Sequence, residues 1–347
     1  MVVSKPTWKH GRRKFENSCS LFVFWLQSSK VDFFFQSQQS EYPNCKCRII
    51  QLSYLQMQSI SRRTFNLIQK CYLVPAICNV WDDEQEKLKK GIKELNLAGD
   101  GRCDSPGHSA KYGSYTLMDT DRQKIINLQI LQSNETNNSN AMELEGLKRG
   151  LKCLEDHGMT ICQIITDRHT SIRSYMAKNK ANIIHYFDCW HVAKGLKKKL
   201  KMASLKKGNE IVKCWIPSII NHLYWCASSS GGNGPVVAAK WESILNHIAN
   251  IHHHENSLYP ECLHDTLEKA WIPFDSKPYK SICDILMNKR LIQDIQKLSP
   301  GNQTSLVEVF HKIICYFAPK SNHFFYSQMK ARTILAALHF NENIGRE

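Results

Sequence analysis

The order of apolar runs between Asn96 and His191 is the feature that most limits how this chain can fold. Three runs with strand character come first, over 95–100, 112–119 and 124–132, and turn residues separate them. They predict an antiparallel meander. A helix, a strand, a helix and a strand follow, and each such strand–helix–strand step predicts a right-handed parallel crossover. We therefore expect an α/β fold with a mixed sheet, three antiparallel strands then two parallel ones, flanked by helices.

The second half of this segment carries the clearest periodicity. A helix is expected from Ser139 or Asn140, either of which can serve as N-cap, to Gly158, because four leucines recur at helical spacing between them. The run 159–166 is almost continuously apolar, which is typical of a strand covered on both faces. A short helix then leads to a last apolar strand over 183–187.

Acidic residues stand at two of the expected strand ends. Asp100 follows the first apolar run directly, and Asp167 follows the fourth. Right-handed crossovers would place the ends of strands one and four side by side, so that the two carboxylates become neighbours. Two such groups, with a third acid from further along the chain, are what a pair of Mg²⁺ or Mn²⁺ ions needs for phosphodiester chemistry.

Charge and cysteine usage indicate the class of partner. Lysine and arginine total 46 against 31 acids, a net charge of +15, which suits a polyanion such as DNA. The 14 cysteines have no framework spacing, and the apolar run 19–26 is too short to span a bilayer. We expect reduced thiols, a nuclear location, DNA as the partner and no membrane, with a second copy of the chain as a further candidate partner.

The chain divides into five expected parts. Residues 1–54 mix basic and aromatic residues without a period and are expected to be irregular, and 55–94 read as a helical lead-in. The sheet core covers 95–196. A helical insertion over 197–300 precedes the helix that carries the last acid, within a C-terminal helical part over 301–347.

A dense set of lysines opens the insertion, and it has two readings. The lysines can form a solvated helix face, or they can contact nucleic acid or serve as a nuclear import signal. The expected DNA-contacting residues are Lys194, Lys197, Lys198, Lys199 and Lys201.

The insertion contains a group of histidines and several tryptophans, and for both groups we favour a structural role over a ligand-binding one. Six potential zinc ligands fall within eighteen positions, but their spacing matches no familiar zinc module, so a structural zinc is the less favoured reading. These residues are His247, His252, His253, His254, Cys262 and His264. The tryptophans Trp215, Trp225 and Trp241 are expected in the core rather than as platforms for base stacking.

An ordered set of short motifs resembles a known group of proteins. The motifs are GDGRCDSPG at 99–107, YGSYTLMD at 112–119, IITDRH at 164–169, FDCWHVAKG at 187–195, LVEVFH at 306–311 and MKART at 329–333. The set is similar to transposase-derived proteins of animal genomes, which belong to the DDE transposases. The resemblance covers about 55–340 and implies a catalytic domain with the ribonuclease H fold.

The resemblance also implies roles for individual acids. Asp167 takes the place of the second catalytic aspartate, and Glu308 takes the place of the third acid. Asp100 is the preferred first acid, but Asp104 has the same strand parity and faces the same side, so both stay candidates.

His191 is a further candidate at the site. The Mutator-like and hAT transposases, which are more distant relatives, place a Cys-x-x-His motif after the fifth strand. Here the matching pair is Asp188 and His191, with Cys189 one position later. This departure leaves two roles for His191, positioning of the scissile phosphate or packing alone.

Two functions from different classes follow. The first is an enzyme that cleaves DNA strands and transfers the freed 3′ end by two-metal-ion catalysis, or the inactive relic of such an enzyme. The second is a domesticated, non-catalytic protein that keeps the fold and binds DNA or protein. The retained acids favour the first, and the absence of a recognisable zinc-finger or helix-turn-helix pattern favours the second.

Overall fold

The computed structural model describes residues 61–105, 110–136, 138–265, 267–301, 304–320 and 322–345. The irregular region expected over 1–54 lies outside them. The chain divides into two compact units, 1–88 with 314–336 and 89–313 with 337–347. The sheet, the helical insertion and every candidate site residue belong to the second unit. Among the described residues, no helix combines the length and the apolarity that a membrane crossing requires.

The described part of the lead-in is helical. Helix α4 (Arg62–Ile68) continues through a π-helical turn, η1 (Gln69–Leu73), into α5 (Val74–Lys89). Ser61 caps α4, because its hydroxyl accepts a hydrogen bond from the Thr64 amide at 3.1 Å.

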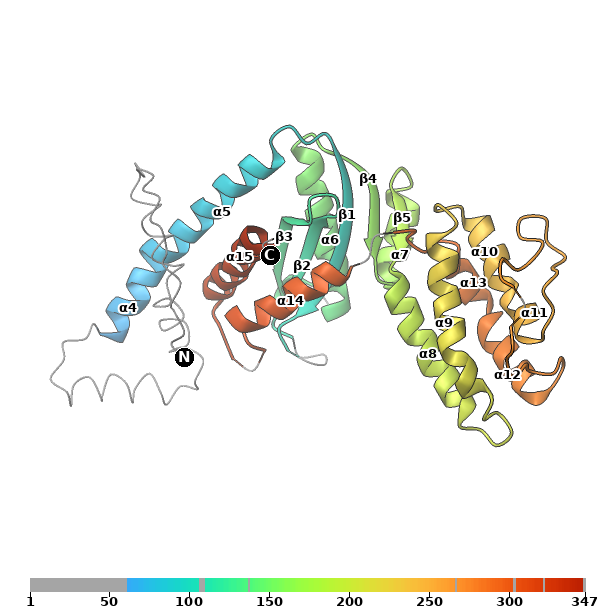
Figure 1. Ribbon diagram of the computed structural model, residues 1–347. Helices are drawn as coiled ribbons and strands as arrows, with labels where there is room; N and C mark the ends of the chain where they lie inside the picture. Colours follow the sequence, from blue (N-terminus) through green and yellow to red (C-terminus); the bar gives the residue numbers. More distant parts are fainter. Residues whose placement is uncertain are drawn as a thin grey trace, which may run out of the picture. The chain divides into compact units, whose positions relative to one another are not determined.

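A five-stranded mixed sheet forms the centre of the second unit (Figure 1). The spatial order is β3-β2-β1-β4-β5, with β1, β2 and β3 antiparallel and with β4 parallel to both β1 and β5. The spatial order therefore differs from a sheet in which the three antiparallel strands are followed in turn by the two parallel ones. The physical reason is the first crossover, which carries β4 back to pair with β1, as expected for the ends of strands one and four. The strands are β1 (Glu94–Cys103), β2 (Tyr112–Asp119), β3 (Lys124–Gln132), β4 (Thr160–Thr166) and β5 (Ile184–Phe187).

Helix α6 (Ser139–Asp156) covers one face of the sheet and follows a short 3-10 turn, η2 (Ser133–Glu135). It lies close to β2, since a Cβ at Gly146 would be 2.5 Å from the Tyr115 Cβ. The N-cap is Asn138, one residue before the expected positions, because its side chain accepts from the Ala141 amide at 2.8 Å. Gly158, at φ +75°, ends the turn after the helix as expected.

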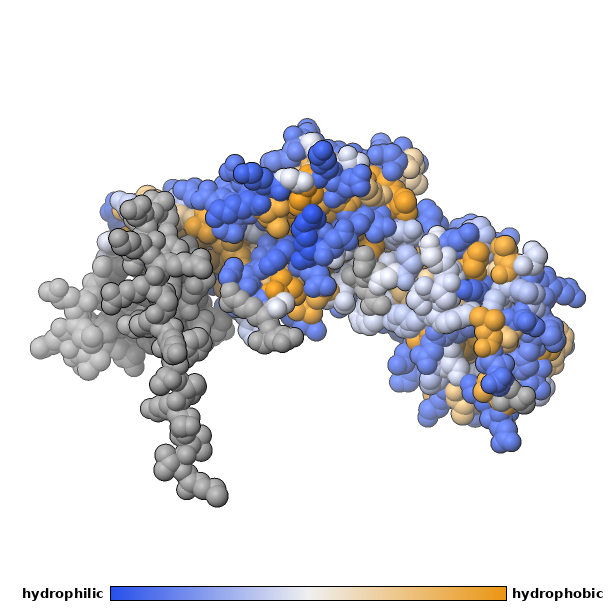
Figure 2. Space-filling view, turned by 45° about the horizontal axis from the view of Figure 1, so that its top comes forward, coloured by the Kyte–Doolittle hydropathy of each residue, from blue (hydrophilic) through white to orange (hydrophobic). Residues whose placement is uncertain are grey.

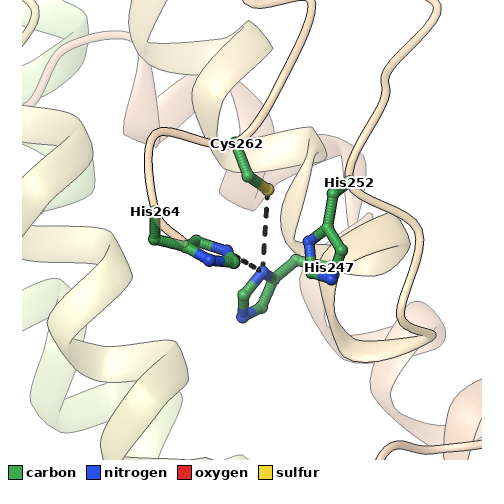
Figure 3. A group of neighbouring side chains, drawn as sticks. All are labelled: His247, His252, Cys262 and His264. Carbon is green, nitrogen blue, oxygen red and sulfur yellow. Dashed lines mark hydrogen bonds between the residues drawn. The ribbon is translucent and has the colours of Figure 1, made fainter. Parts of the chain in front are cut away.

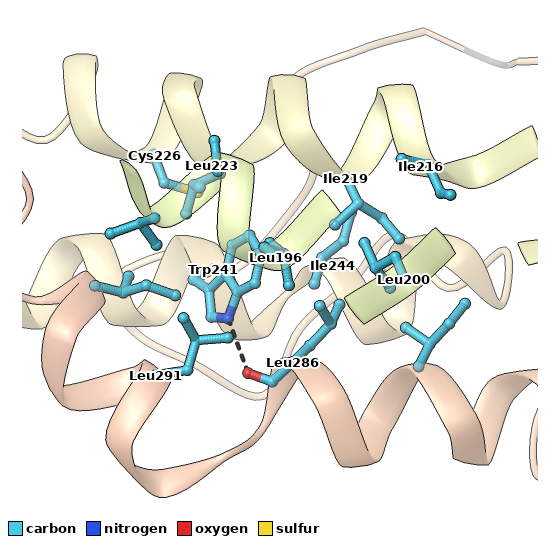
Figure 4. Packing of buried hydrophobic residues seen from close by; sticks show 14 of the residues in the cluster. Leu196, Leu200, Ile216, Ile219, Leu223, Cys226, Trp241, Ile244, Leu286 and Leu291 are labelled. Atoms are coloured by element: carbon cyan, nitrogen blue, oxygen red, sulfur yellow. Dashed lines mark hydrogen bonds between the residues drawn. The ribbon is translucent and has the colours of Figure 1, made fainter. Parts of the chain in front are cut away.

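The helices of the insertion pack around a hydrophobic core that is separate from the sheet. Trp241 is fully buried at its centre and donates from Nε1 to the Leu286 carbonyl oxygen at 3.2 Å (Figure 4). Trp215 is also buried, so the expectation that these two tryptophans are core residues is confirmed, and Trp225 is partly buried against the same core. The helices that follow β4 are α7 (Thr170–Asn179), α8 (Cys189–Ser204), α9 (Val212–Ser228), α10 (Gly234–Glu242), α11 (Ile244–Ile248), α12 (Lys277–Leu286) and α13 (Lys289–Ile295).

Two contacts join the insertion to the sheet. Asp294 in α13 is buried and pairs with Arg168 at 3.1 Å and with Arg173 at 2.5 Å. The chain after α13 then runs beside the end of β5, where the Phe187 amide donates to the Lys297 carbonyl oxygen at 2.6 Å. This return places the next helix, α14 (Ser305–Phe317), near the sheet, and α15 (Tyr326–Asn343) is the last helix in the described part of the chain.

The described surface is predominantly hydrophilic on the face shown in Figure 2, where hydrophobic residues form separate groups.

Candidate active site

The register of two parallel strands places the first two candidate acids next to each other. Ala98 in β1 pairs with Ile165 in β4. Asp100 and Asp167 each follow two residues later, so both stand just beyond the last paired position on strands that lie about 4.8 Å apart. Asp100 does not end its strand, in contrast to the expectation from the sequence, since β1 continues to Cys103 through its antiparallel pairing with β2.

Asp104 has a different role from Asp100. Its carboxylate accepts a hydrogen bond from the Lys111 amide at 3.0 Å, and its own amide donates to the Tyr112 carbonyl oxygen at 3.0 Å. These hydrogen bonds close the hairpin between β1 and β2. Of the two candidates for the first acid, Asp100 is the one beside Asp167.

Glu143, in the first turns of α6, is an acid that the sequence did not single out for the site. A Cβ on Gly101 would lie 2.6 Å from its Cγ, so the absence of a side chain at Gly101 makes room for this carboxyl group against β1. Burial, together with the negative charges of Asp167 and Asp100, raises the pKa of Glu143 to about 8. Glu143 is thus close enough to interact with both aspartates.

Helix α14 faces the same acids from another side. Asp100 pairs with Thr116 across β1 and β2, and their side chains share a face of the sheet. His311 contacts both, with Nδ1 3.4 Å from the Asp100 carboxylate and Nε2 3.2 Å from the Thr116 hydroxyl. One turn earlier, Glu308 lies with Oε1 3.5 Å from Nε2 of His191. Glu308 is partly exposed, and its partner among the described residues is the His191 imidazole.

Asp188 holds His191 in position. Asp188 is buried at the N-cap of α8, where it accepts hydrogen bonds from the Trp190 amide at 2.9 Å, from the Thr304 hydroxyl and from His191 Nδ1 at 3.0 Å. Burial raises the pKa of Asp188, but these hydrogen bonds outweigh it and hold the pKa below its usual range. The Asp188 hydrogen bond in turn raises the pKa of His191 against the opposing effect of burial. His191 is therefore oriented on both sides, by Asp188 and by Glu308.

Cys189 takes no part in this arrangement. It is buried in the core of the insertion, and burial together with the charge of Asp188 raises its pKa to about 12. A thiol in that state is not a ligand or nucleophile at neutral pH.

Asp100, Asp167 and Glu143 have no lysine or arginine partner among the described residues, in contrast to buried Asp294. One Asp167 oxygen accepts from the His169 amide at 3.0 Å, and Asp100 accepts from the Gly101 amide at 2.8 Å. Burial raises the pKa of Asp167, and the charge of Asp100 raises it further, partly offset by the His169 amide. Carboxyl groups gathered without a lysine or arginine partner favour a cation from solution.

The predicted trio is nevertheless not assembled as one ligand set. Over the described ranges, Asp100, Asp167 and Glu308 do not bring three ligand atoms close enough together for a single ion, as a His/Cys group elsewhere in the chain does. The physical reason is that Glu308 pairs with His191 and Asp100 with His311, so the two imidazoles hold these carboxylates from the side of the helices.

The basic helix begins at this site. Helix α8 starts one residue after Asp188, and its lysines follow His191 along an exposed face. Lys194 also lies over the Trp190 ring at 4.5 Å. The exposed lysines are Lys194, Lys197, Lys198, Lys199 and Lys201.

Two residues of the site were not expected from the sequence. Glu143 stands out there only for its place near the start of a helix, and His311 only as part of a motif. The helical offset of three between Glu308 and His311 was a usable signal, because it places both on one side of α14. Neither a protein-family model nor a curated protein matches this sequence.

Proposed function

We propose that this chain is a DNA strand-cleaving and strand-transferring enzyme of the DDE transposase type, built on a ribonuclease H-like sheet. The observation that carries the proposal is the equivalent position of Asp100 and Asp167 on neighbouring parallel strands, beside Glu143 and without a lysine or arginine partner in the described residues. Glu308 and His191 lie at the same edge of the sheet and complete the proposed site.

The chemistry of the donor set fits a hard divalent cation, and a shift of side chains would have to complete it, because among the described residues the ligand atoms of Asp100, Asp167 and Glu143 are not gathered around one point as those of the His/Cys group are. Asp100, Asp167 and Glu143 offer carboxylate oxygens, which Mg²⁺ and Mn²⁺ prefer. Within the described chain, Asp167 Oδ2 and both Glu143 oxygens have no hydrogen-bond partner, so they are free to act as ligands. When bound, such ions supply Lewis-acid stabilisation of the phosphate and of the attacking oxygen.

The protein side chains then have separate tasks. Asp100 and Asp167 would hold the metal, and Glu143 would approach it from α6. His191, which carries a proton more readily because Asp188 accepts its hydrogen bond, would donate from Nε2 to a phosphate oxygen in place of Glu308. Glu308, released from His191, would turn toward the aspartates.

DNA would reach this site along α8. The exposed lysines of α8 begin within one turn of His191. A DNA sugar-phosphate backbone bound by these lysines would therefore run toward the acids. A net charge of +15 supports association with a polyanion, and a nuclear location belongs to the same proposal.

Strand cleavage that requires a divalent cation is the direct test. Purified protein is incubated with end-labelled duplex DNA and Mg²⁺ or Mn²⁺, and products are resolved on a denaturing gel. We expect cleavage with either ion and none after chelation with EDTA, because the site residues would have nothing with which to offset phosphate charge. Cleavage that continues unchanged in EDTA would refute the proposed mechanism.

One observation favours a second candidate, a non-catalytic protein that binds DNA. Glu308, the third acid of the proposed chemistry, contacts His191 and is therefore not available as a metal ligand in this structure. Tight DNA binding with no cleavage in Mg²⁺ or Mn²⁺ would support this candidate over the enzyme.

The lysine face of α8 gives a separate prediction about DNA binding. Replacing Lys197, Lys198 and Lys199 together by alanine should weaken binding and flatten the dependence of log K on log salt by up to about 3, roughly one for each phosphate that a lysine no longer neutralises. The measurement is fluorescence anisotropy over a salt series. Alanine at three other exposed lysines, Lys152, Lys178 and Lys213, is the matched control and should leave the slope unchanged. Equal slopes in both triple variants would remove α8 from the interface.

A further inference from the structure

The long loop after α11 gathers a group of histidines and a cysteine that the proposed function does not use. His247 lies in α11, and His252, Cys262 and His264 come from the loop that follows. Their ligand atoms all lie within 4.8 Å of one another, and the four side chains point toward a common centre (Figure 3). The sequence spacing does not favour zinc, so tertiary structure alone reveals this group.

A short antiparallel contact in the loop explains the convergence. His253 forms an isolated bridge with Glu261, and the Cys262 amide donates to the His252 carbonyl oxygen at 2.9 Å. This register places His252 directly opposite Cys262, so their side chains lie on the same face of the pair. His253 and Glu261 point the other way and are exposed.

Two of the separations, both to His247 Nδ1, match the edges of a tetrahedron around zinc. Metal–ligand lengths of 2.0–2.1 Å for nitrogen and 2.3 Å for sulfur give edges of about 3.4 Å between nitrogens and about 3.6 Å between nitrogen and sulfur. His264 Nε2 lies 3.2 Å from His247 Nδ1, and the Cys262 sulfur lies 3.7 Å from the same nitrogen. A zinc ion therefore requires little rearrangement of these three side chains.

Outer hydrogen bonds direct the lone pairs of two histidines to the centre. Asp265 offers a carbonyl oxygen, which only accepts, 2.6 Å from His264 Nδ1, so Nδ1 carries the proton and Nε2 is free to bind. His252 Nε2 lies 3.0 Å from Asn250 Oδ1. Its other nitrogen, Nδ1, is buried without a hydrogen-bond partner in the described residues. A buried nitrogen in that state is costly unless something binds it.

The loop has little else to hold it. Between α11 and α12, the described residues form no helix and most side chains are exposed, with Tyr259 and Ile272 as the buried hydrophobic ones. Loops of this length in a compact domain are uncommon without a stabilising device. A cavity of about 400 Å³ borders the group, with His247, Cys262 and His264 in its wall, and gives an ion access.

We propose that His247, His252, Cys262 and His264 bind one structural zinc ion that fixes this loop on the insertion. One thiolate and three imidazoles suit Zn²⁺ and not Mg²⁺ or Ca²⁺, and four protein ligands leave no open position for catalysis. His254, whose Nε2 lies 3.3 Å from the Cys262 sulfur, supports the thiolate from outside the ligand set. The site is independent of the acids proposed for DNA cleavage.

Metal content and cobalt spectroscopy test this site. The full chain is stripped of metal with a chelator, reloaded with Zn²⁺ in excess Mg²⁺, desalted and analysed by mass spectrometry for zinc. We expect about one zinc ion per chain. Cys262→Ser and His252→Ala should each lower zinc affinity by at least about 100-fold, since loss of an outer partner alone costs 10–100-fold. The matched controls, Cys214→Ser and His253→Ala, should retain the metal.

The Co²⁺-loaded wild-type chain provides a readout that does not depend on a variant folding. Tetrahedral coordination by one thiolate predicts intense visible d–d bands and a thiolate-to-cobalt charge-transfer band. A weak octahedral spectrum without that charge-transfer band would overturn the proposal, as would equal zinc in Cys262→Ser and Cys214→Ser. Because DNA cleavage is measured separately, a failed zinc site and a failed cleavage assay are distinguishable.

Discussion

Asp100→Asn and Asp167→Asn should each abolish metal-dependent DNA cleavage, by about 1,000-fold or more, and leave the protein folded. Asparagine keeps the size of the side chain and its hydrogen-bond acceptor but loses the negative charge that would hold the cation. A bound cation contributes several kcal/mol of transition-state stabilisation, and each 1.36 kcal/mol is a factor of ten in rate. The measurement is the initial cleavage rate in Mn²⁺ and in Mg²⁺.

Asp104→Asn is the matched control for these two variants. Asp104 closes the β1–β2 hairpin through the Lys111 amide, and an asparagine oxygen can accept the same hydrogen bond. We therefore expect cleavage within about threefold of wild type, a change below 1 kcal/mol. Loss of cleavage in Asp104→Asn with retention in Asp100→Asn would reverse the assignment of the first acid.

Thermal melting separates a metal site from a structural role for the same acids. Removing one charge from a group of like charges without a lysine or arginine partner in the described residues should not destabilise the metal-free protein. Added Mn²⁺ should raise the melting temperature of the wild type, because it binds only the folded protein. It should leave the melting temperature of Asp167→Asn unchanged. A variant that melts well below the wild type, with the same response to Mn²⁺, would indicate a structural residue.

Trp241→Ala should destabilise the chain by about 3–5 kcal/mol, the usual cost of truncating a fully buried aromatic side chain. Trp241 is enclosed by α9, α12 and α13, and its truncation also leaves the Leu286 carbonyl oxygen without its partner (Figure 4). The measurement is urea unfolding of the full chain followed by circular dichroism.

Two further variants show which part of this loss is packing. Trp241→Phe keeps most of the buried ring and loses the hydrogen bond, so we expect a cost of about 1–2 kcal/mol. Leu205→Ala truncates a side chain that is 72% exposed and should cost less than about 0.5 kcal/mol. Equal losses for Trp241→Ala and Leu205→Ala would mean that this core does not limit stability.

The strands and helices of the core could be predicted from the sequence because their signals are local. The run 112–119 and the run 124–132 form β2 and β3 with the expected bounds, and β5 begins within one residue of expectation. An alternating or continuous apolar run indicates which faces of a strand are buried, and this pattern can be seen within the segment itself.

The partners of individual polar side chains were harder to predict from the sequence. Asp100 and Asp104 have the same parity, so no local pattern separates them, and only the register of β1 with β4 brings Asp100 beside Asp167. Glu143 reaches the site because Gly101 leaves space for it, a fact of packing between a helix and a strand distant in sequence. The pairing of Glu308 with His191 depends on a return of the chain after an insertion of about a hundred residues.

The amino-acid sequence alone determined the strand and helix order, the mixed α/β class, the positive charge and the acids worth testing, since these follow from local periodicity and composition. Tertiary structure decided which acids meet, which histidines hold them, and that four ligands in the loop after α11 converge. The reason is that pairing register and side-chain convergence are set by contacts between residues far apart in the chain, and such contacts leave no periodic trace in the sequence.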